Sequence, residues 1–446
     1  MRGAVRRVTF QDEAVCLDGQ LLPVPPQGKD MSTHGALPPP TSPVVKAMQP
    51  LQAPESPRAR RPSAISSISS GRTSARPRNI DGALAPLPPP SKAPVLDEPA
   101  LIYQPQLATS SSLQQLVSQP SAFKGNSVLS VADYERSDLH LLFTVAQEMR
   151  VRVQREALDL LRGRVLCSLF YEPSTRTSAS FDAAMKYLGG NTVVVSVAHS
   201  SVQKGETLQD TLRTLGQYGN AVVLRHPDER SMDVARRTSP VPVINAGNGS
   251  KEHPTQAFLD LFTIREELGT VQGLTITFVG DLLYGRTVHS LCNLLKHYQV
   301  QIQLVAPKAL ALPSKLRDEL VARGQLLGEF ESLTRDIVAR SDVLYCTRVQ
   351  QERFPSAHEY EKVKGSYRID NATLRYAKAN MIVMHPLPRN EEIAEEVDFD
   401  ERAAYYRQVC SAMTELSLWI PWLTVSTQMK YGLWCRMALL ALVMSP

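Results

Sequence analysis

Residues 174–177 read Ser-Thr-Arg-Thr and place three hydroxyl groups and one guanidinium between a strand-like run and an amphipathic run. The first amides of a helix have no partner inside the helix, and the helix dipole makes that end positive. Hydroxyl donors and an arginine fork at such an end suit a bound phosphate. A helix start that is only capped by its hydroxyls, with a surface arginine, explains these four residues equally well when they are taken alone.

Further along the chain, strand-like runs repeatedly end in arginine, histidine or amide side chains. Arg225 ends one run, where an ordinary surface turn is the plainer explanation for a single such residue. His253 and Gln256 lie about one helical turn apart where a helix should begin, so they can point at a shared target. The later runs are followed by Arg286, by Arg348 with Gln350, and by residues 385–389, which include Leu387 and Pro388.

The recurrence of these groups predicts one cleft for anions. In parallel α/β sheets, ligands bind beyond the carboxyl ends of the strands, so residues that follow different strands meet there. The chain has no GxxxxGK[ST], HExxH, GxSxG or GxGxxG pattern and no cluster with metal-ligand spacing. The pattern therefore favours a phosphate-bearing small substrate that meets a second anionic substrate, without a metal or cofactor.

The elements that must position these residues form two α/β domains. Nearly apolar runs alternate with helical ones, which is typical of parallel sheets covered on both faces. The first series of strands and helices ends with a helix over 254–267, and a new series begins with the run at 274–281. We therefore expect two doubly wound parallel-sheet domains, at 121–268 and 269–408, with the active site in the cleft between them.

The first 120 residues differ in composition from the rest. Residues 1–30 alternate apolar and polar side chains around Asp18-Gly19, a favoured hairpin turn, and are expected to be the edge of a larger domain. Residues 31–120 are rich in Pro, Ser and Ala and poor in large apolar side chains, which predicts a disordered linker. Within it, Ser63 follows three arginines, as in a site for a basophilic kinase or in an unmodified basic linker.

Composition and cysteine usage indicate a cytoplasmic protein. The formal charge of +5 is too small to favour a nucleic-acid partner by itself. The six cysteines are scattered without CxxC spacing, which suits free thiols in a reducing compartment. No secretory signal opens the sequence, and its most apolar segment, 433–444, is too short to span a bilayer and contains Arg436.

Seven motifs make this sequence resemble a known family. In order and spacing STRT, KGETLQDT, VLRHP, HPTQAFLDLFTI, GRTVHSL, YCTRVQ and HPLPR are similar to those of the aspartate carbamoyltransferase family. The resemblance covers about 125–408 and again 429–444. Residues 1–30 resemble the tail of a dihydroorotase domain, and the Pro/Ser-rich stretch resembles an interdomain linker, as at the end of multifunctional pyrimidine-synthesis polypeptides that also contain carbamoyl-phosphate synthase.

The resemblance implies an activity and an assembly. Family members transfer the carbamoyl group of carbamoyl phosphate to L-aspartate, giving N-carbamoyl-L-aspartate and phosphate, as homotrimers with shared active sites. It makes 121–268 the carbamoyl-phosphate-binding domain, 269–408 the aspartate-binding domain, and 429–446 a helix that packs back on the first domain. The resemblance implies no cofactor, no metal, no nucleic-acid partner and no membrane partner.

The family's functional residues map onto matching positions of this chain. The residues implied for carbamoyl phosphate are Ser174, Thr175, Arg176, Thr177, Ser200, Arg225, His253, Gln256 and the backbone at Leu387 and Pro388. The residues implied for aspartate are Lys204, Arg286, Arg348 and Gln350. Ser200 and Lys204 belong to a loop that in the family reaches into the neighbouring subunit's site.

The implied chemistry needs little from a protein base. Attack of the amine on the carbamoyl carbon creates an oxyanion, which Thr177, Arg225 and His253 would stabilise as preorganised donors, with Arg176 holding the phosphate. The phosphate itself can accept the amine proton. Most of the catalysis would then come from orientation and electrostatics, and the arginines would offset the repulsion between two anionic substrates.

Two substitutions and one insertion depart from the family pattern. Leu283 and Gln351 stand where lysine is frequent, which removes positive charge near the aspartate site without removing a primary contact. Residues 409–428 intervene before the final helix. If this insert is real, we expect two exposed tryptophans, Trp419 and Trp422, and a strained chain closure to destabilise the pairing of the two domains. The insert begins with Val and ends with Gln, whose codons can supply the GT and AG ends of an intron.

Two other functions remain open at this level. Ornithine carbamoyltransferase shares the carbamoyl phosphate half, but that family typically shows HCLP where this chain has HPLPR, and the Arg348/Gln350 pair favours aspartate. A non-catalytic scaffold fragment of a multifunctional polypeptide is the alternative from another class. Polar residues retained at every strand end argue against it.

We interpret 409–428 as a retained in-frame intron or a gene-model error, with a genuine loop as the alternative. Sequencing of the mature transcript should then give a message in which codon 408 is followed directly by codon 429. A mature message that still encodes the insert would contradict this interpretation.

Overall fold

The computed structural model describes residues 8–11, 14–17, 20–21, 110–153, 155–351, 354, 356–405 and 427–445. The chain divides into two units, with a small sheet in the first and an α/β body in the second. In the small sheet, β1 (Val8–Gln11) pairs with β2 (Ala14–Leu17), and β2 pairs with β3 (Gln20–Leu21). Leu17 pairs with Gln20 on either side of Asp18-Gly19, so the predicted hairpin is confirmed, and β1 adds a third strand.

The first domain of the body contains a four-stranded parallel sheet in the order β5-β4-β6-β7. Its strands are β4 (Val165–Phe170), β5 (Asn191–Ser196), β6 (Ala221–His226) and β7 (Val243–Asn248). Its helices are α2 (Arg136–Arg152), α3 (Thr175–Tyr187), α4 (Leu208–Tyr218) and α5 (Ser231–Thr238). After β4 the chain goes first to β5 on one side and then to β6 on the other. The point between β4 and β6 is therefore a topological switch point, where such sheets bind ligands.

The second domain contains a five-stranded parallel sheet in the order β10-β9-β8-β11-β12. Its strands are β8 (Thr275–Val279), β9 (Gln301–Val305), β10 (Leu326–Phe330), β11 (Val343–Cys346) and β12 (Ile382–Met384). Its helices are α7 (Arg286–Leu294), α8 (Ser314–Ala322), α9 (Arg335–Arg340), α10 (Ala357–Val363) and α11 (Asn371–Leu374). Its switch point lies between β8 and β11. The predicted fold class, two doubly wound parallel-sheet domains, is confirmed.

One hydrophobic core extends through both domains. Helix α6 (Pro254–Leu268) is buried at every position from Pro254 to Ile264, so it is covered on all sides rather than along one stripe. The same apolar cluster joins Phe143 of α2, Phe258 of α6 and Phe278 of β8. Because the domains share this core, apolar packing brings the residues at their strand ends close to one another.

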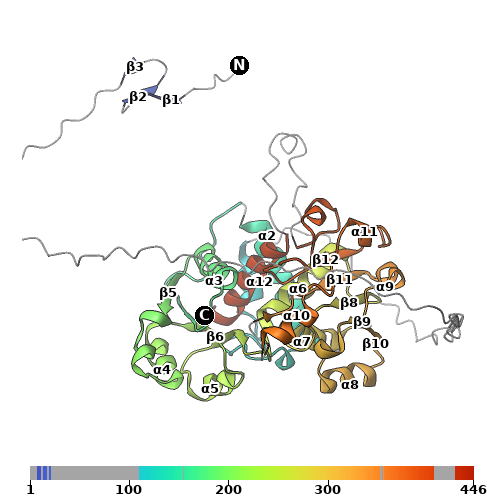
Figure 1. Ribbon diagram of the computed structural model, residues 1–446. Helices are drawn as coiled ribbons and strands as arrows, with labels where there is room; N and C mark the ends of the chain where they lie inside the picture. The colour runs from blue at the N-terminus through green and yellow to red at the C-terminus, as the bar shows by residue number, and fades with distance from the viewer. Residues whose placement is uncertain are drawn as a thin grey trace, which may run out of the picture. The chain divides into compact units, whose positions relative to one another are not determined.

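Helix α12 (Thr427–Met444) completes this core from the far end of the chain. It packs on α2, α3 and α6, and in Figure 1 it is the red helix beside them. Its residues 437–443 are all buried. The described helix therefore lies on the first domain although residues 406–426, which contain most of the insert, lie outside the described part of the chain.

The structure corrects the linker prediction at its end. Residues 31–109 lie outside the described residues, but Ser110–Ser118 form helix α1, whose Leu113 and Val117 are buried in the core. These two residues are four positions apart and share one helix face. The composition averaged over residues 31–120 concealed this short apolar stripe, so the prediction of disorder was wrong for this helix.

Other differences are local. The residues from Asp138 to Leu161 have helical spacing, but helix α2 ends at Arg152, with Val153 as its C-cap. Strand β10 lies at the edge of its sheet and has no buried residue, so no buried apolar run marks it in the sequence. Among the helices of the described residues, none is both long enough and apolar enough to cross a membrane.

Candidate active site

A cavity of about 960 Å³ lies where the switch points of the two sheets face each other. Twelve of the residues implied for substrate binding line it: Ser174, Thr175, Arg176, Thr177, Arg225, His253, Gln256, Arg286, Arg348, Gln350, Leu387 and Pro388. Ser200 and Lys204 do not line it; they belong to the short helical segment Ser201–Lys204 and its N-cap, outside the cavity. The cavity therefore collects side chains from both domains, but not those of the 200–204 segment.

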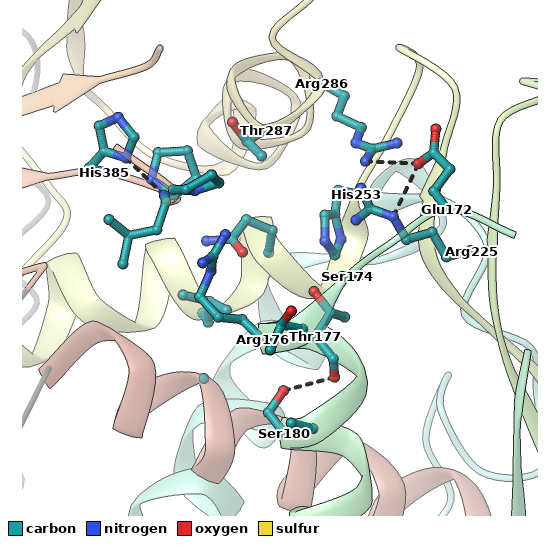
Figure 2. A pocket seen from close by; sticks show the side chains of 18 of the residues that line it. Glu172, Ser174, Arg176, Thr177, Ser180, Arg225, His253, Arg286, Thr287 and His385 are labelled. Carbon is teal, nitrogen blue, oxygen red and sulfur yellow. Dashed lines mark hydrogen bonds and ion pairs between the residues drawn. The ribbon is translucent and has the colours of Figure 1, made fainter. Parts of the chain in front are cut away.

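The first turn of α3 faces this cavity. Ser174 is the N-cap residue, yet its side chain makes no capping hydrogen bond to the helix. The Ser174 carbonyl accepts from Ser178 Oγ at 2.6 Å. Ser180 Oγ donates to the Thr177 carbonyl at 2.9 Å, as Figure 2 shows. The simple capping interpretation therefore fails for Ser174, whose hydroxyl is left for another partner.

Glu172 is the carboxylate of this cavity. Its Oε2 accepts from Arg225 Nε at 3.1 Å and from Arg286 Nη2 at 3.4 Å, so it bridges the two domains (Figure 2). Arg286 also donates to the Gly249 carbonyl at 2.6 Å. Gly247 has a φ of 118°, and a Cβ there would come within 3.0 Å of the Arg286 guanidinium. Glycine at this position lets the guanidinium lie against the backbone.

His253 lies at the start of α6 and is held from both domains. Its backbone N–H donates to Ser290 Oγ of α7 at 2.9 Å. Burial, together with the positive charges of Arg286 and Arg225, lowers the pKa of His253 well below its usual value. The imidazole is therefore neutral at pH 7, with one ring nitrogen as donor and the other as acceptor.

Gln256 is oriented by a buried carboxylate on its own helix. Its Nε2 donates to Asp260 Oδ1 at 2.9 Å, and Tyr345 of β11 donates its hydroxyl to the other Asp260 oxygen at 2.7 Å. This network joins α6 to the second sheet, so the contact that fixes Gln256 also fixes the two domains.

Gln350 is held in place by the turn that follows β8 in the second domain. The buried Asp281 accepts the N–H of Tyr284 at 2.9 Å and that of Gln350 at 3.4 Å. The Gln350 side chain donates to the Tyr284 carbonyl at 3.1 Å. Backbone and side chain of Gln350 are thus both held by the segment that leads into Arg286, so these two cavity residues share one support.

His385 determines the backbone at Leu387. The Leu387 N–H donates to His385 Nδ1 at 2.8 Å, which makes Nε2 the protonated nitrogen that donates to Glu392 at 2.9 Å. Burial lowers the pKa of His385 although Glu392 opposes the shift. Leu387 has a φ of 57°, in the left-handed region that residues other than glycine seldom adopt. The neutral imidazole keeps this turn in place at the cavity wall.

Sequence reasoning missed several lining residues. Glu172 directly precedes the Pro-Ser-Thr-Arg-Thr run at a strand end, and this position was a usable signal. Gly432, Leu433 and Arg436 come from α12, more than 170 positions beyond His253, and the only signal for them was the charge of Arg436 in the apolar run 433–444. The departures Leu283 and Gln351 do not line the cavity among the described residues.

The fold and this site define an α/β protein with an anion-binding cleft between two domains. Among the lining residues are five arginines, Arg176, Arg225, Arg286, Arg348 and Arg436, against the one carboxylate of Glu172. Family models agree with that class. The carbamoyl-P binding domain of aspartate/ornithine carbamoyltransferase matches residues 126–266, and the Asp/Orn binding domain matches residues 272–414. The chain belongs to the aspartate/ornithine carbamoyltransferase family.

Relatives and solved structures give the same grouping. The chain is 57% identical to the multifunctional protein pyrABCN of Emericella nidulans over all of its own length, but over 19% of that protein. It is 46% identical to the aspartate carbamoyltransferase catalytic subunit of Thermococcus kodakarensis, covering 65% of this chain and 94% of that one. The aspartate transcarbamoylase of Trypanosoma cruzi in complex with carbamoyl phosphate and aspartate matches with a TM-score of 0.66 at 41% identity, covering 74% of this chain and 99% of that one. The chain spans about a fifth of the multifunctional relatives.

The lowered pKa values of His253 and His385 predict acid sensitivity. Below about pH 6.5 the unfolded chain takes up protons that these buried imidazoles do not, so the free energy of unfolding falls as pH falls. Urea unfolding at pH 7.5 and 5.5 should show a loss of about 1 kcal/mol for each such histidine. In His385→Asn the loss should be smaller by that amount, whereas the exposed control His140→Asn should behave like the parent chain. An unchanged pH dependence in His385→Asn would contradict the assignment.

Proposed function

We propose that this chain transfers the carbamoyl group of carbamoyl phosphate to the amine of L-aspartate, giving N-carbamoyl-L-aspartate and phosphate in pyrimidine (UMP) biosynthesis. The observation that carries the proposal is that the N-terminus of α3 and the arginines of the second domain line one cavity. A phosphate-bearing substrate and a dicarboxylate can therefore be held side by side, which is what this reaction requires.

The first domain would bind carbamoyl phosphate. Ser174, Thr175, Arg176 and Thr177 would hold the phosphate at the helix N-terminus. Arg225 and the neutral His253 would donate to the carbamoyl oxygen as it becomes an oxyanion, with Thr177 as a further donor. Neutral His253 suits this role because a donor without a full charge adds no repulsion to the neighbouring guanidiniums.

The second domain would bind aspartate. Arg286, Arg348 and Gln350 would hold its two carboxylates, and the backbone at Leu387 and Pro388 would accept from the nitrogen groups. The amine then attacks the carbamoyl carbon, the carbon–oxygen bond to phosphate breaks, and the departing phosphate takes the amine proton. In the structure Glu172 pairs with both Arg225 and Arg286, so an incoming carboxylate has to compete with it for Arg286.

A homotrimer with shared sites is part of the same proposal. Ser200 and Lys204 lie away from the cavity of their own chain, so they would serve a neighbour. Strand β5, just ahead of them, is a sheet edge on which Val193 and Val194 are 43% and 68% exposed. An apolar, unpaired edge of this kind suits burial against another subunit. A cytoplasmic location suits the four described cysteines, all of them free and buried.

The activity is tested by incubating the purified chain with carbamoyl phosphate and aspartate and measuring N-carbamoyl-L-aspartate and phosphate. Product should form with aspartate and not with ornithine. Arg176→Ala should lower kcat by about 10²–10³-fold, as loss of a donor to developing charge does. The exposed Arg213→Ala, which removes only a surface pair with Asp210, should leave kcat unchanged. A folded chain that makes no product with either amine, even after removal of 409–428, would favour the scaffold alternative.

Shared sites are tested by combining two inactive variants. Lys204→Ala and Arg176→Ala, refolded together, should regain part of the parent activity, because some sites then receive intact Arg176 from one subunit and intact Lys204 from another. Each variant refolded alone should stay inactive. A mixture with no more activity than its components would exclude sharing.

A further inference from the structure

Arg436 is a buried cation that no assigned function uses. It lies on α12, is 5% exposed, and lines the cavity. Its guanidinium lies over the Phe181 ring of α3, with 5.3 Å between Cζ and the ring centroid. Its Nε has no hydrogen-bond partner among the residues that the structure describes. Burial lowers the pKa of Arg436 to about 10, so the charge is kept at a cost in solvation.

No neighbouring carboxylate accounts for this charge. Among the described residues, the ion pairs do not include Arg436. Asp260 interacts with it electrostatically, but the two Asp260 oxygens accept from Gln256 and Tyr345. A buried cation without a paired anion is strongly destabilising unless something else compensates for it.

Helix α12 also has space for the Arg436 guanidinium, because residue 432 is a glycine. Gly432 lies one turn before Arg436, and a Cβ at this glycine would come within 2.7 Å of Arg436 Nη1 and 3.2 Å of Leu259 Cδ2. Glycine inside a helix is less stable than alanine by about 1 kcal/mol. A glycine inside a helix and a buried guanidinium without an ion pair both lower stability, and together they place one positive charge at the cavity wall.

We propose that Arg436 is a further binding residue for the phosphate end of carbamoyl phosphate, contributed by the last helix. The identity of the ligand rests on the proposed function. The phosphate end is favoured because Arg436 packs on α3, the helix whose N-terminus faces the cavity, and because Ser180 and Ala183 of that helix line the cavity with it. A phosphate dianion would supply the ion pair that Arg436 does not form with any carboxylate among the described residues.

The test uses inorganic phosphate as the probe, at constant ionic strength set with chloride. Melting temperature is followed as phosphate is titrated into the full chain, Arg436→Met and Arg150→Met. Arg150 is the matched control, since its guanidinium lies over the Tyr431 and Trp434 rings of the same α12 but pairs with Glu266 and does not line the cavity.

Arg436→Met should melt at or above the temperature of the parent chain without phosphate, because an uncompensated buried charge has been removed. Its apparent Kd for phosphate should rise by about tenfold or more, as expected for loss of a charge-assisted contact. Arg150→Met should keep the parent Kd. In steady-state assays, the KM for carbamoyl phosphate should rise in Arg436→Met while the KM for aspartate stays unchanged.

Equal phosphate affinity in Arg436→Met and the parent chain would overturn the proposal, and so would a parent chain that phosphate does not stabilise. If Arg436→Met does not fold, Arg436→Lys takes its place, because lysine keeps the positive charge but cannot donate two parallel hydrogen bonds to phosphate. A parent-like Kd for phosphate and a parent-like KM for carbamoyl phosphate in Arg436→Lys would overturn the proposed guanidinium contact. A parent chain that binds phosphate through Arg436 but forms no N-carbamoyl-L-aspartate would refute the proposed reaction and leave the anion site standing.

Discussion

Repulsion among guanidiniums is the constraint on which this structure depends. Five arginines line one cavity and a single carboxylate, Glu172, faces them. Like charges close to one another repel, so the packed elements around the cavity have to hold these guanidiniums in place. Glu172 relieves part of this repulsion by bridging Arg225 and Arg286, and in doing so it ties the first domain to the second.

The elements around the cavity are held together because the two sheets share one core. Helix α6 is buried on all sides, carries His253 and Gln256 at its start, and reaches the second sheet through Asp260 and Tyr345. The His253 N–H crosses to Ser290 of α7 in the same way. Packing energy from this core therefore holds polar groups in positions that their own electrostatics would oppose.

The cavity is assembled from distant parts of the chain. Two topological switch points supply its walls, and α12 closes it with Gly432, Leu433 and Arg436. Residues 200–204 remain outside it, next to the exposed edge of β5. The arrangement of a single chain thus explains why twelve of the expected site residues converge on one cavity, and it leaves Ser200 and Lys204 outside that cavity.

The sequence by itself determined the alternation of strands and helices, hence two parallel-sheet domains, because apolar strands and helical periodicity are local patterns. It also identified twelve of the cavity residues, since the ends of parallel strands meet at one edge. Only the tertiary structure decided that Glu172 pairs with Arg225 and Arg286, that the Ser174 hydroxyl does not cap its helix, and that α12 brings Arg436 to the cavity. These are contacts between elements far apart in the chain, which depend on how helices and sheets pack and leave no periodic trace in the residues that make them.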